Sequence, residues 1–242
     1  MKVPQLKKKT ELKSCHNTNW EDDYSWVHQP NILEVLKDGS KLDPEVRKYL
    51  EEENNYTEHH LKDTKGIQKT LFDEIKGRIK LDDESIPFKD RNYEYWTRTT
   101  TKGNYSIKLR KKIGTDLIEE YWNGDEEKKK LNTEYFGVGD IEVSYNDKIL
   151  GYSLDLKGSE YYTIYLRDIE TNKIISEKIE DTAGGITFSL DDKFIFYSKL
   201  DKFHRPRKIY RHKIGDNISN DKLIFEEKSE AFTVGISLTS DE

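Results

Sequence analysis

Residues 143–153 read VSYNDKILGYS, and the same pattern returns at 188–198 as FSLDDKFIFYS. The offset is constant at 45 residues and persists downstream, where Ile164-Tyr165 corresponds to Ile209-Tyr210. A third copy opens at 236–241 with ISLTSD. Each full copy places two apolar runs around a turn of Asn and Asp, residues that tolerate tight turns. A repeat of this length made of short strands is typical of β-propeller blades.

Strand and turn patterns on both sides of the repeated stretch predict the bounds of the individual blades. The second blade is predicted at about 136–180, with strands near 139–145, 149–155, 162–168 and 173–178. The third is predicted at about 184–228, with strands near 186–190, 194–200, 208–213 and 222–226. A hairpin of period two at 93–98 and 106–110, followed by an apolar run ending at Asn123-Gly124, indicates a more divergent first blade at about 88–130. A fourth blade starts at 232 and supplies one strand with its turn.

The residues before the blades read as an arm. Residues 1–42 look irregular, and a helix is expected from Asp43-Pro44, an acidic N-cap followed by proline at the first helical position. Gly66 is expected to break or bend this helix, which runs to residue 80. Beyond it, four residues at four-residue spacing form one apolar stripe that needs a covering surface: Ile67, Leu71, Ile75 and Ile79.

The fold class predicted is therefore mainly β with a helical N-terminal arm. The arm covers residues 1–86, and residues 87–242 form an incomplete β-propeller of about three four-stranded blades plus the start of a fourth. Two flanks of such an open set of blades, and the strand edge of the last one, would be uncovered, which invites aggregation.

Composition narrows the class of protein. Of 242 residues, 33% are hydrophobic and 36% are charged, and the net charge is −6 with both signs interspersed. This balance argues against a general nucleic-acid or membrane binder, and no segment approaches the length of a membrane span. The basic start has no apolar run behind it, so no secretory signal is read. A single cysteine, Cys15, excludes an intrachain disulfide framework and favours a reducing, cytoplasmic setting.

Several polar clusters could suggest chemistry, but each has a structural interpretation. His59-His60 are adjacent on a helix and point in different directions, so they chelate poorly. Asp82-Asp83-Glu84 lie in a charged linker and favour a turn or cap role over acid–base catalysis. A basic cluster could contact acidic groups of a partner or a peptide carboxylate, although a solvated blade edge is favoured: His204, Arg205, Arg207, Arg211 and His212.

The glycines, serines and the cysteine are read in the same way. Gly137-Val138-Gly139 and Gly184-Gly185 lack the full phosphate-loop pattern and fall at matching places before a first strand, so they are interpreted as blade-entry glycines in tight packing. Three serines lack the strand–turn–helix context of an activated nucleophile: Ser144, Ser159 and Ser189. Cys15 is followed by His16, but a catalytic dyad is built in space and not by adjacency.

In its order of motifs, the chain resembles oligopeptidase B (protease II), within the prolyl oligopeptidase family of serine peptidases. The markers run nearly end to end, and their order and spacing together carry the resemblance: Asp23-Tyr24-Ser25-Trp26, Tyr49-Leu50-Glu51-Glu52-Glu53-Asn54, Arg78-Ile79-Lys80-Leu81-Asp82-Asp83 with Pro87, Glu160-Tyr161-Tyr162-Thr163, Ala183-Gly184-Gly185, and Arg205-Pro206-Arg207-Lys208-Ile209-Tyr210-Arg211-His212. One departure is Val27-His28, where the family usually has Leu-Arg.

The resemblance implies an α/β-hydrolase domain combined with a seven-bladed propeller that restricts the active site to short peptides, cut after Arg or Lys. It also implies that the arm packs on the hydrolase domain, which would cover the stripe at 67–79. The nucleophile elbow Gly-x-Ser-x-Gly does not occur in this sequence, and in this architecture Ser, Asp and His all follow the propeller. The predicted catalytic, cofactor-binding and metal-binding residues of this chain are therefore none.

Two functions follow as expectations. In the first, the chain is the amino-terminal part of a serine oligopeptidase, inactive alone, whose partners are the missing peptidase domain and, through the full enzyme, short basic peptides. In the second, the chain is a stand-alone interaction scaffold or the remnant of a degenerate gene. The sequence leaves open whether Glu242 marks a gene break, a chosen boundary or a natural end, and whether a separate chain supplies the triad.

Overall fold

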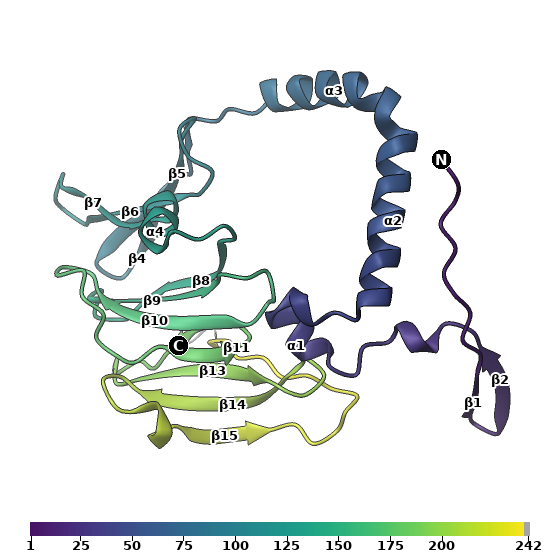
Figure 1. Ribbon diagram of the computed structural model, residues 1–242. Coiled ribbons are helices and arrows are strands. Elements are labelled where there is room, and N and C mark those ends of the chain that lie inside the picture. The colour runs from purple at the N-terminus through teal and green to yellow at the C-terminus, as the bar shows by residue number, and fades with distance from the viewer. Residues whose placement is uncertain (240–242) are drawn as a thin grey trace. The chain divides into compact units, whose positions relative to one another are not determined.

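The computed structural model describes residues 1–239, and it divides the chain into two compact units, Met1–Lys80 and a second unit from Leu81 onward. Figure 1 shows a helical first unit and a β-rich second unit. The boundary expected from the sequence lay after residue 86. Residues 81–86 belong to the second unit because β3 (Asp83–Glu84) pairs antiparallel with β5 (Tyr93–Thr99).

The first unit opens with a β-hairpin where the sequence suggested irregular chain. Strands β1 (Glu11–Cys15) and β2 (Thr18–Asp22) pair antiparallel in a continuous register. The two turn residues, His16 and Asn17, have φ of 48° and 63°, as a two-residue hairpin turn of this kind requires. His-Asn is a weaker hairpin signal than Asn-Gly, so this element was not predicted. Short helical segments follow: η1 (Ser25–Val27), α1 (Ile32–Lys37) and η2 (Gly39–Lys41).

Helix α2 (Pro44–Leu61) starts where the sequence predicted. The Asp43 carboxylate accepts hydrogen bonds from the backbone N–H groups of Glu45 and Val46 at 2.8 and 3.2 Å, which satisfies two donors of the first turn. The expected bend at Gly66 is displaced. The chain changes direction at η3 (Lys62–Thr64), where the Thr64 hydroxyl donates to the Leu61 carbonyl at 2.7 Å, and Gly66 lies inside α3 (Lys65–Gly77) (Figure 1).

The second unit begins with one five-stranded antiparallel sheet. Strands β3 and β4 (Phe88–Asp90) both pair with β5, and β6 (Ile107–Lys112) and β7 (Ile118–Asn123) follow in order. This sheet is the first blade. It is followed by a helix that the sequence analysis did not predict, α4 (Gly124–Leu131), whose N-cap Asn123 accepts the Glu126 N–H at 3.2 Å.

The second and third blades follow the predicted repeat. Their strands are β8 (Gly137–Val143), β9 (Ile149–Asp155), β10 (Tyr162–Asp168), β11 (Ile179–Thr182), β12 (Thr187–Phe188), β13 (Phe194–Leu200), β14 (Pro206–Lys213) and β15 (Lys222–Glu226). All neighbours pair antiparallel, and Thr182 of β11 also pairs with Lys199 of β13, so both blades belong to one eight-stranded sheet in which β12 lies off the main path and pairs with β13.

Two strand predictions differ from the structure. The last strand of the second blade, expected at 173–178, lies at 179–182, and the expected segment contributes an isolated bridge between Ile174 and Arg167. Residues 232–239 carry no strand in the described chain. The turn of the expected fourth blade falls at 240–241, outside the described residues.

The repeated turns have the same hydrogen bonds in both copies. The Ser144 hydroxyl donates to the Asn146 side chain at 2.9 Å and accepts the Ile149 N–H at 2.9 Å. The Ser189 hydroxyl does the same toward Asp191 and the Phe194 N–H, at 2.7 and 3.0 Å. These serines therefore fix the turn between the first two strands of each blade.

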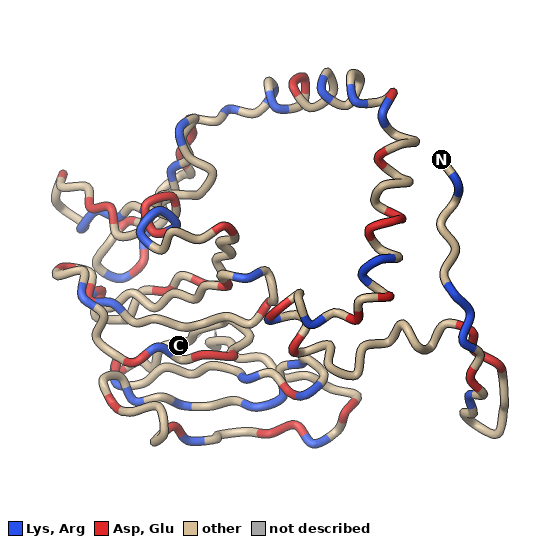
Figure 2. Tube along the Cα trace, in the orientation of Figure 1, with Lys and Arg blue, Asp and Glu red and all other residues tan. Residues whose placement is uncertain are grey.

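The core lies between the blades. One cluster joins the second and third blades and consists of Ile164, Leu166, Ile179, Ile186, Phe188, Ile195 and Tyr197. The other joins the first and second blades and consists of Trp122, Phe136, Leu150, Tyr152 and Leu154. Charges of both signs are interspersed along both units (Figure 2). None of the helices within residues 1–239 has the length and apolarity needed to cross a bilayer.

Candidate functional site: an acidic, aromatic cavity

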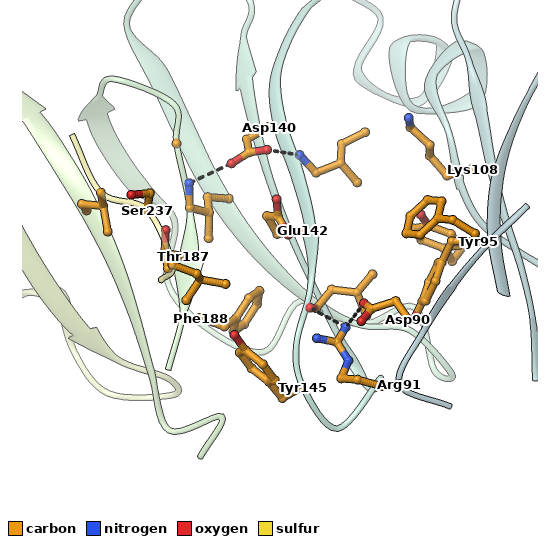
Figure 3. A pocket seen from close by; sticks show the side chains of 18 of the residues that line it. Asp90, Arg91, Tyr95, Lys108, Asp140, Glu142, Tyr145, Thr187, Phe188 and Ser237 are labelled. Carbon is orange, nitrogen blue, oxygen red and sulfur yellow. Dashed lines mark hydrogen bonds and ion pairs between the residues drawn. The ribbon is translucent and has the colours of Figure 1, made fainter. Parts of the chain in front are cut away.

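The three blades line an open-sided cavity of about 720 Å³. Its wall combines β4, β8 and β12, the first-blade strands β5 to β7, and the segment 235–238. Figure 3 labels ten of the side chains that line it: Asp90, Arg91, Tyr95, Lys108, Asp140, Glu142, Tyr145, Thr187, Phe188 and Ser237. The cavity is thus assembled from segments more than a hundred residues apart in sequence.

Asp140 and Glu142 bring two carboxylates to the same wall. They are two residues apart on β8, so both side chains lie on one face of the strand. Asp140 is held firmly, since its carboxylate accepts the N–H groups of Ile141 and Ile186, each at 2.9 Å. Asp140 therefore also ties the first strand of the second blade to the start of the third.

Glu142 points into the cavity without such anchors (Figure 3). Burial among the cavity walls, reinforced by the Asp140 carboxylate, raises the pKa of Glu142 to about 7, while Arg91 acts in the opposite direction. The side chain still reaches solvent through the open side of the cavity. Glu142 is therefore a carboxyl group that changes charge near neutral pH.

Arg91 supplies the facing positive charge. It has a φ of 50°, and its guanidinium pairs with Asp90 at 2.8 Å and lies 4.9 Å from the centre of the Tyr145 ring. On the same side of the cavity, the Tyr95 hydroxyl donates to the Asp147 carboxylate, which also lies 3.6 Å from Arg91. Phe88 is an exposed aromatic residue of the lining. Carboxylates beside aromatic faces favour cationic groups, which bind such rings through cation–π attraction. No histidine or cysteine is among the described lining residues.

The glycines assigned to blade entry differ in their packing. A Cβ at Gly139 would lie 2.5 Å from the Ser153 hydroxyl and 2.7 Å from the Tyr162 ring. At Gly184, whose φ is +96°, the same ring would lie at 3.0 Å. Tight packing is thus confirmed for these two positions. It is wrong for Gly185, where a Cβ would meet nothing within 4 Å.

The acidic run Asp82-Asp83-Glu84 is joined to the first blade. Asp82 accepts the Thr101 N–H at 2.8 Å, and Glu84 accepts the Trp96 indole N–H at 3.1 Å. These carboxylates hold the blade edge, and the structure does not bring them together as a pair facing a cleft.

Two of the histidines lie on the last turn of α2. His59 Nε2 is 3.3 Å from the N-terminal nitrogen, and the His60 ring packs on Tyr56. Within the described residues, no group of three or more His, Cys, Asp or Glu side chains is arranged to hold a metal ion.

The solvated blade edge expected around His212 is wrong. The His212 side chain is 0% exposed, because β14 lies between β13 and β15 and is not an edge strand. The arginines beside it bind acceptors of this chain: Arg205 donates to the Glu230 carbonyl at 2.6 Å and Arg207 to the Glu227 carbonyl at 3.0 Å.

The remaining candidates have local roles. Ser159 is buried and accepts the Tyr161 N–H at 3.3 Å. Cys15 is exposed at the end of β1. Sequence analysis did not single out Asp140 or Glu142, although acids at alternate positions after a blade-entry glycine were a usable signal. It also missed Ser176, which hydrogen-bonds to His212.

Comparisons with known proteins agree with this architecture. Residues 4–242 match the family described as "Prolyl oligopeptidase, N-terminal beta-propeller domain". Dipeptidyl aminopeptidase BI of Pseudoxanthomonas mexicana is 28% identical over 99% of this chain, and Protease 2 of Moraxella lacunata is 28% identical over 98%. This chain covers 34% of each of these relatives, so it spans about a third of their length.

Solved structures give the same fold. Oligopeptidase B from Leishmania major superposes with a TM-score of 0.83 at 23% identity, over 96% of this chain and 34% of that one. Oligopeptidase B from Trypanosoma brucei, with covalently bound antipain in a closed form, superposes with a TM-score of 0.84 at 22% identity, over 99% of this chain and 34% of that one.

Proposed function

Because this chain belongs to the prolyl oligopeptidase family as its N-terminal β-propeller domain, we propose that it acts as the propeller part of a serine oligopeptidase. The family and the propeller fold predicted from the sequence are confirmed. The catalytic Ser, Asp and His would come from an α/β-hydrolase peptidase domain, in the same polypeptide or in a separate chain. The propeller then covers the active site and admits short peptides, and this chain alone does not hydrolyse them.

The apolar face of α3 is the observation that carries this proposal. Ile67, Leu71 and Ile75 are 58%, 49% and 60% exposed, although their spacing is that of a helix face built to be covered. Fully burying one such side chain contributes about 1.5–3 kcal/mol. A peptidase domain packed on this face would bury all three and so hold the propeller over its active site. The apolar stripe predicted from the sequence extended to Ile79, but α3 ends at Gly77, so Ile79 lies outside the helix.

The cavity supports a preference for peptides that carry Arg or Lys. Asp140 and, when ionised, Glu142 offer negative charge, and the exposed Phe88 offers an aromatic face. Both features attract guanidinium and ammonium groups. A reducing, cytoplasmic setting is part of the same proposal and is supported by the single cysteine, Cys15.

The proposal is tested by incubating the purified chain with a fluorogenic Arg-amide peptide, alone and after adding a purified peptidase domain of this family. We expect no turnover from the chain alone and restricted cleavage of longer peptides when the two parts associate. Turnover by the chain alone that survives repurification would contradict the proposal. A stoichiometric partner unrelated to peptidases would instead favour an interaction scaffold.

A further inference from the structure

Hydrogen bonds connect Ser176 to His212 and His212 to Asp221, in a part of the second unit away from the cavity. The Ser176 hydroxyl is 2.9 Å from His212 Nε2, and His212 Nδ1 is 2.7 Å from an Asp221 carboxylate oxygen. Both distances are within the range in which a base takes a proton from a hydroxyl. Neither the sequence motifs nor the proposed function accounts for this arrangement.

Separate elements of two blades position the three side chains. Ser176 lies between the bridge at Ile174 and β11 in the second blade, His212 lies on β14, and Asp221 follows η4 (Ile218–Asn220) in the third blade. The second Asp221 oxygen accepts the Tyr197 hydroxyl at 2.7 Å. Asp221 is thus fixed from both sides, and it fixes the His212 ring in turn.

The contacts of Asp221 also assign the protons. An ionised carboxylate only accepts hydrogen bonds, so Nδ1 of His212 carries the proton that it shares with Asp221. In the neutral ring Nε2 is then the bare nitrogen, and the Ser176 hydroxyl donates to it. This is the orientation in which an imidazole can act as a general base toward a serine.

Ser176 is reachable from outside, although His212 is not. The side chain of His212 is 0% exposed, whereas Ser176 is half-buried and lines a surface cavity of about 460 Å³ between residues 174–177 and 215–217. Ser176 lines this cavity and His212 does not, so a small electrophile that enters it would reach Ser176 before the base. The serines of the repeated turns differ, because Ser189 donates to Asp191 and not to an imidazole.

We propose that Ser176, His212 and Asp221 form a second nucleophilic site, at which Ser176 accepts an acyl or phosphonyl group from an activated ester or phosphonofluoridate. With an activated ester, the Oγ–C bond forms, the ester C–O bond breaks, and the leaving alkoxide takes up the proton to depart as the alcohol. With a phosphonofluoridate, the Oγ–P bond forms and the P–F bond breaks. Fluoride leaves, and the hydroxyl proton passes to His212 Nε2 and then to solvent. Ser176 is the nucleophile, His212 is the base, and the Asp221 carboxylate orients the His212 ring. The proposed reaction is a single stoichiometric transfer to each chain. It is independent of any partnership with a peptidase domain.

The test is labelling of the purified full chain with a fluorophosphonate probe, followed by peptide mapping. We expect one equivalent of label on Ser176, none on that peptide in Ser176→Ala, and unchanged labelling of Ser176 in the matched variant Ser189→Ala. General-base assistance predicts that Ser176 reacts about 10²-fold faster than an unassisted serine. A folded chain in which Ser176 stays unlabelled would overturn the proposal.

Asp221→Asn separates activation from simple exposure. The amide of this variant donates to Nδ1, which moves the ring proton to Nε2 and removes the base while keeping the side-chain size. We expect labelling of Ser176 to slow by at least about tenfold, with circular dichroism and the melting temperature showing that the variant is folded. Labelling at the wild-type rate in folded Asp221→Asn would show that the three residues only join the two blades.

Discussion

The carboxylate of Asp192 accepts the backbone N–H of Asn146 at 2.8 Å. The same carboxylate accepts the Tyr145 N–H at 2.7 Å, so the first turn of the third blade holds the first turn of the second. The equivalent residue one repeat earlier, Asp147, accepts the Asn92 side-chain amide and the Tyr95 hydroxyl of the first blade at 3.0 and 2.9 Å. The repeated aspartate therefore joins each blade to the one before it.

Removing this link should loosen the two blades. Asp192→Ala leaves two backbone N–H groups without their charged acceptor, and we expect the free energy of unfolding to fall by about 1–3 kcal/mol. Urea unfolding followed by tryptophan fluorescence measures the change. The exposed Glu170→Gln is the control and should have no effect. An Asp192→Ala variant as stable as the wild type would show that the turns do not hold the blades.

Close packing around Gly139, at the start of the second blade, allows a second prediction. Gly139→Ala places a methyl group against Ser153 and Tyr162 at 2.5 and 2.7 Å, which we expect to cost about 1–3 kcal/mol of stability. Gly185→Ala is the matched control, because nothing lies within 4 Å of its Cβ, and its effect should stay within about 0.5 kcal/mol. Equal effects in thermal melts of both variants would refute the packing argument.

Glu142 should make stability depend on pH. Burial and the Asp140 carboxylate raise its pKa to about 7 in the folded chain, against about 4.3 when unfolded. Between these values the folded state holds a proton that the unfolded state has released, so the free energy of unfolding falls as pH rises through this window.

The side chain of the Glu142→Gln variant cannot ionise, so its free energy of unfolding should not fall as pH rises through this window. Its melting temperature should match the wild type near about pH 4, where both side chains are neutral, and exceed it near about pH 8. The gain is smaller than the full pKa shift implies, because the side chain reaches solvent and is screened. The exposed Glu134→Gln serves as the control. A Glu142→Gln variant that follows the wild type at both pH values would place the carboxyl group in ordinary solvent.

The apolar face of α3 should bind a hydrophobic dye in the isolated chain. The double variant Ile67→Ser and Ile75→Ser should lower the dye fluorescence, whereas Lys69→Ser and Asp73→Ser, a surface ion pair on the same helix, should not. Urea unfolding of the blades should be unaffected by either pair, since α3 belongs to the other unit. Unchanged dye fluorescence in the isoleucine variant would mean that the face is already covered.

The repeat allowed much of the fold to be predicted, because its turn residues use the same hydrogen bonds twice. Ser144 with Asn146, and Ser189 with Asp191, mark strand ends through hydrogen bonds between residues only two positions apart in the sequence. Elements without such markers were missed. The hairpin at β1 and β2 turns on His16-Asn17, and α4 reads as a charged loop unless Asn123 is recognised as its cap.

The sites were harder to predict because they depend on pairing between distant segments. His212 was interpreted as an edge residue although a strand at 222–226 was predicted to follow 208–213; in the structure β15 pairs beside β14 and covers that edge. Asp140 and Glu142 face Arg91 across two blades, and Ser176 meets His212 from a neighbouring blade at 2.9 Å. Such contacts follow from blade order and register, which local periodicity does not specify.

The proposed partner of this propeller is a peptidase domain. The most direct measurement is to purify the chain from its own cells through an N-terminal tag, assay the product for Arg-amide hydrolysis and map its peptides. We expect hydrolysis that co-purifies with a Gly-x-Ser-x-Gly peptide, in the same polypeptide or in a bound one. If the two are separate chains, this hydrolysis should be lost with the double isoleucine variant. A tagged product without hydrolysis and without such a peptide would contradict it.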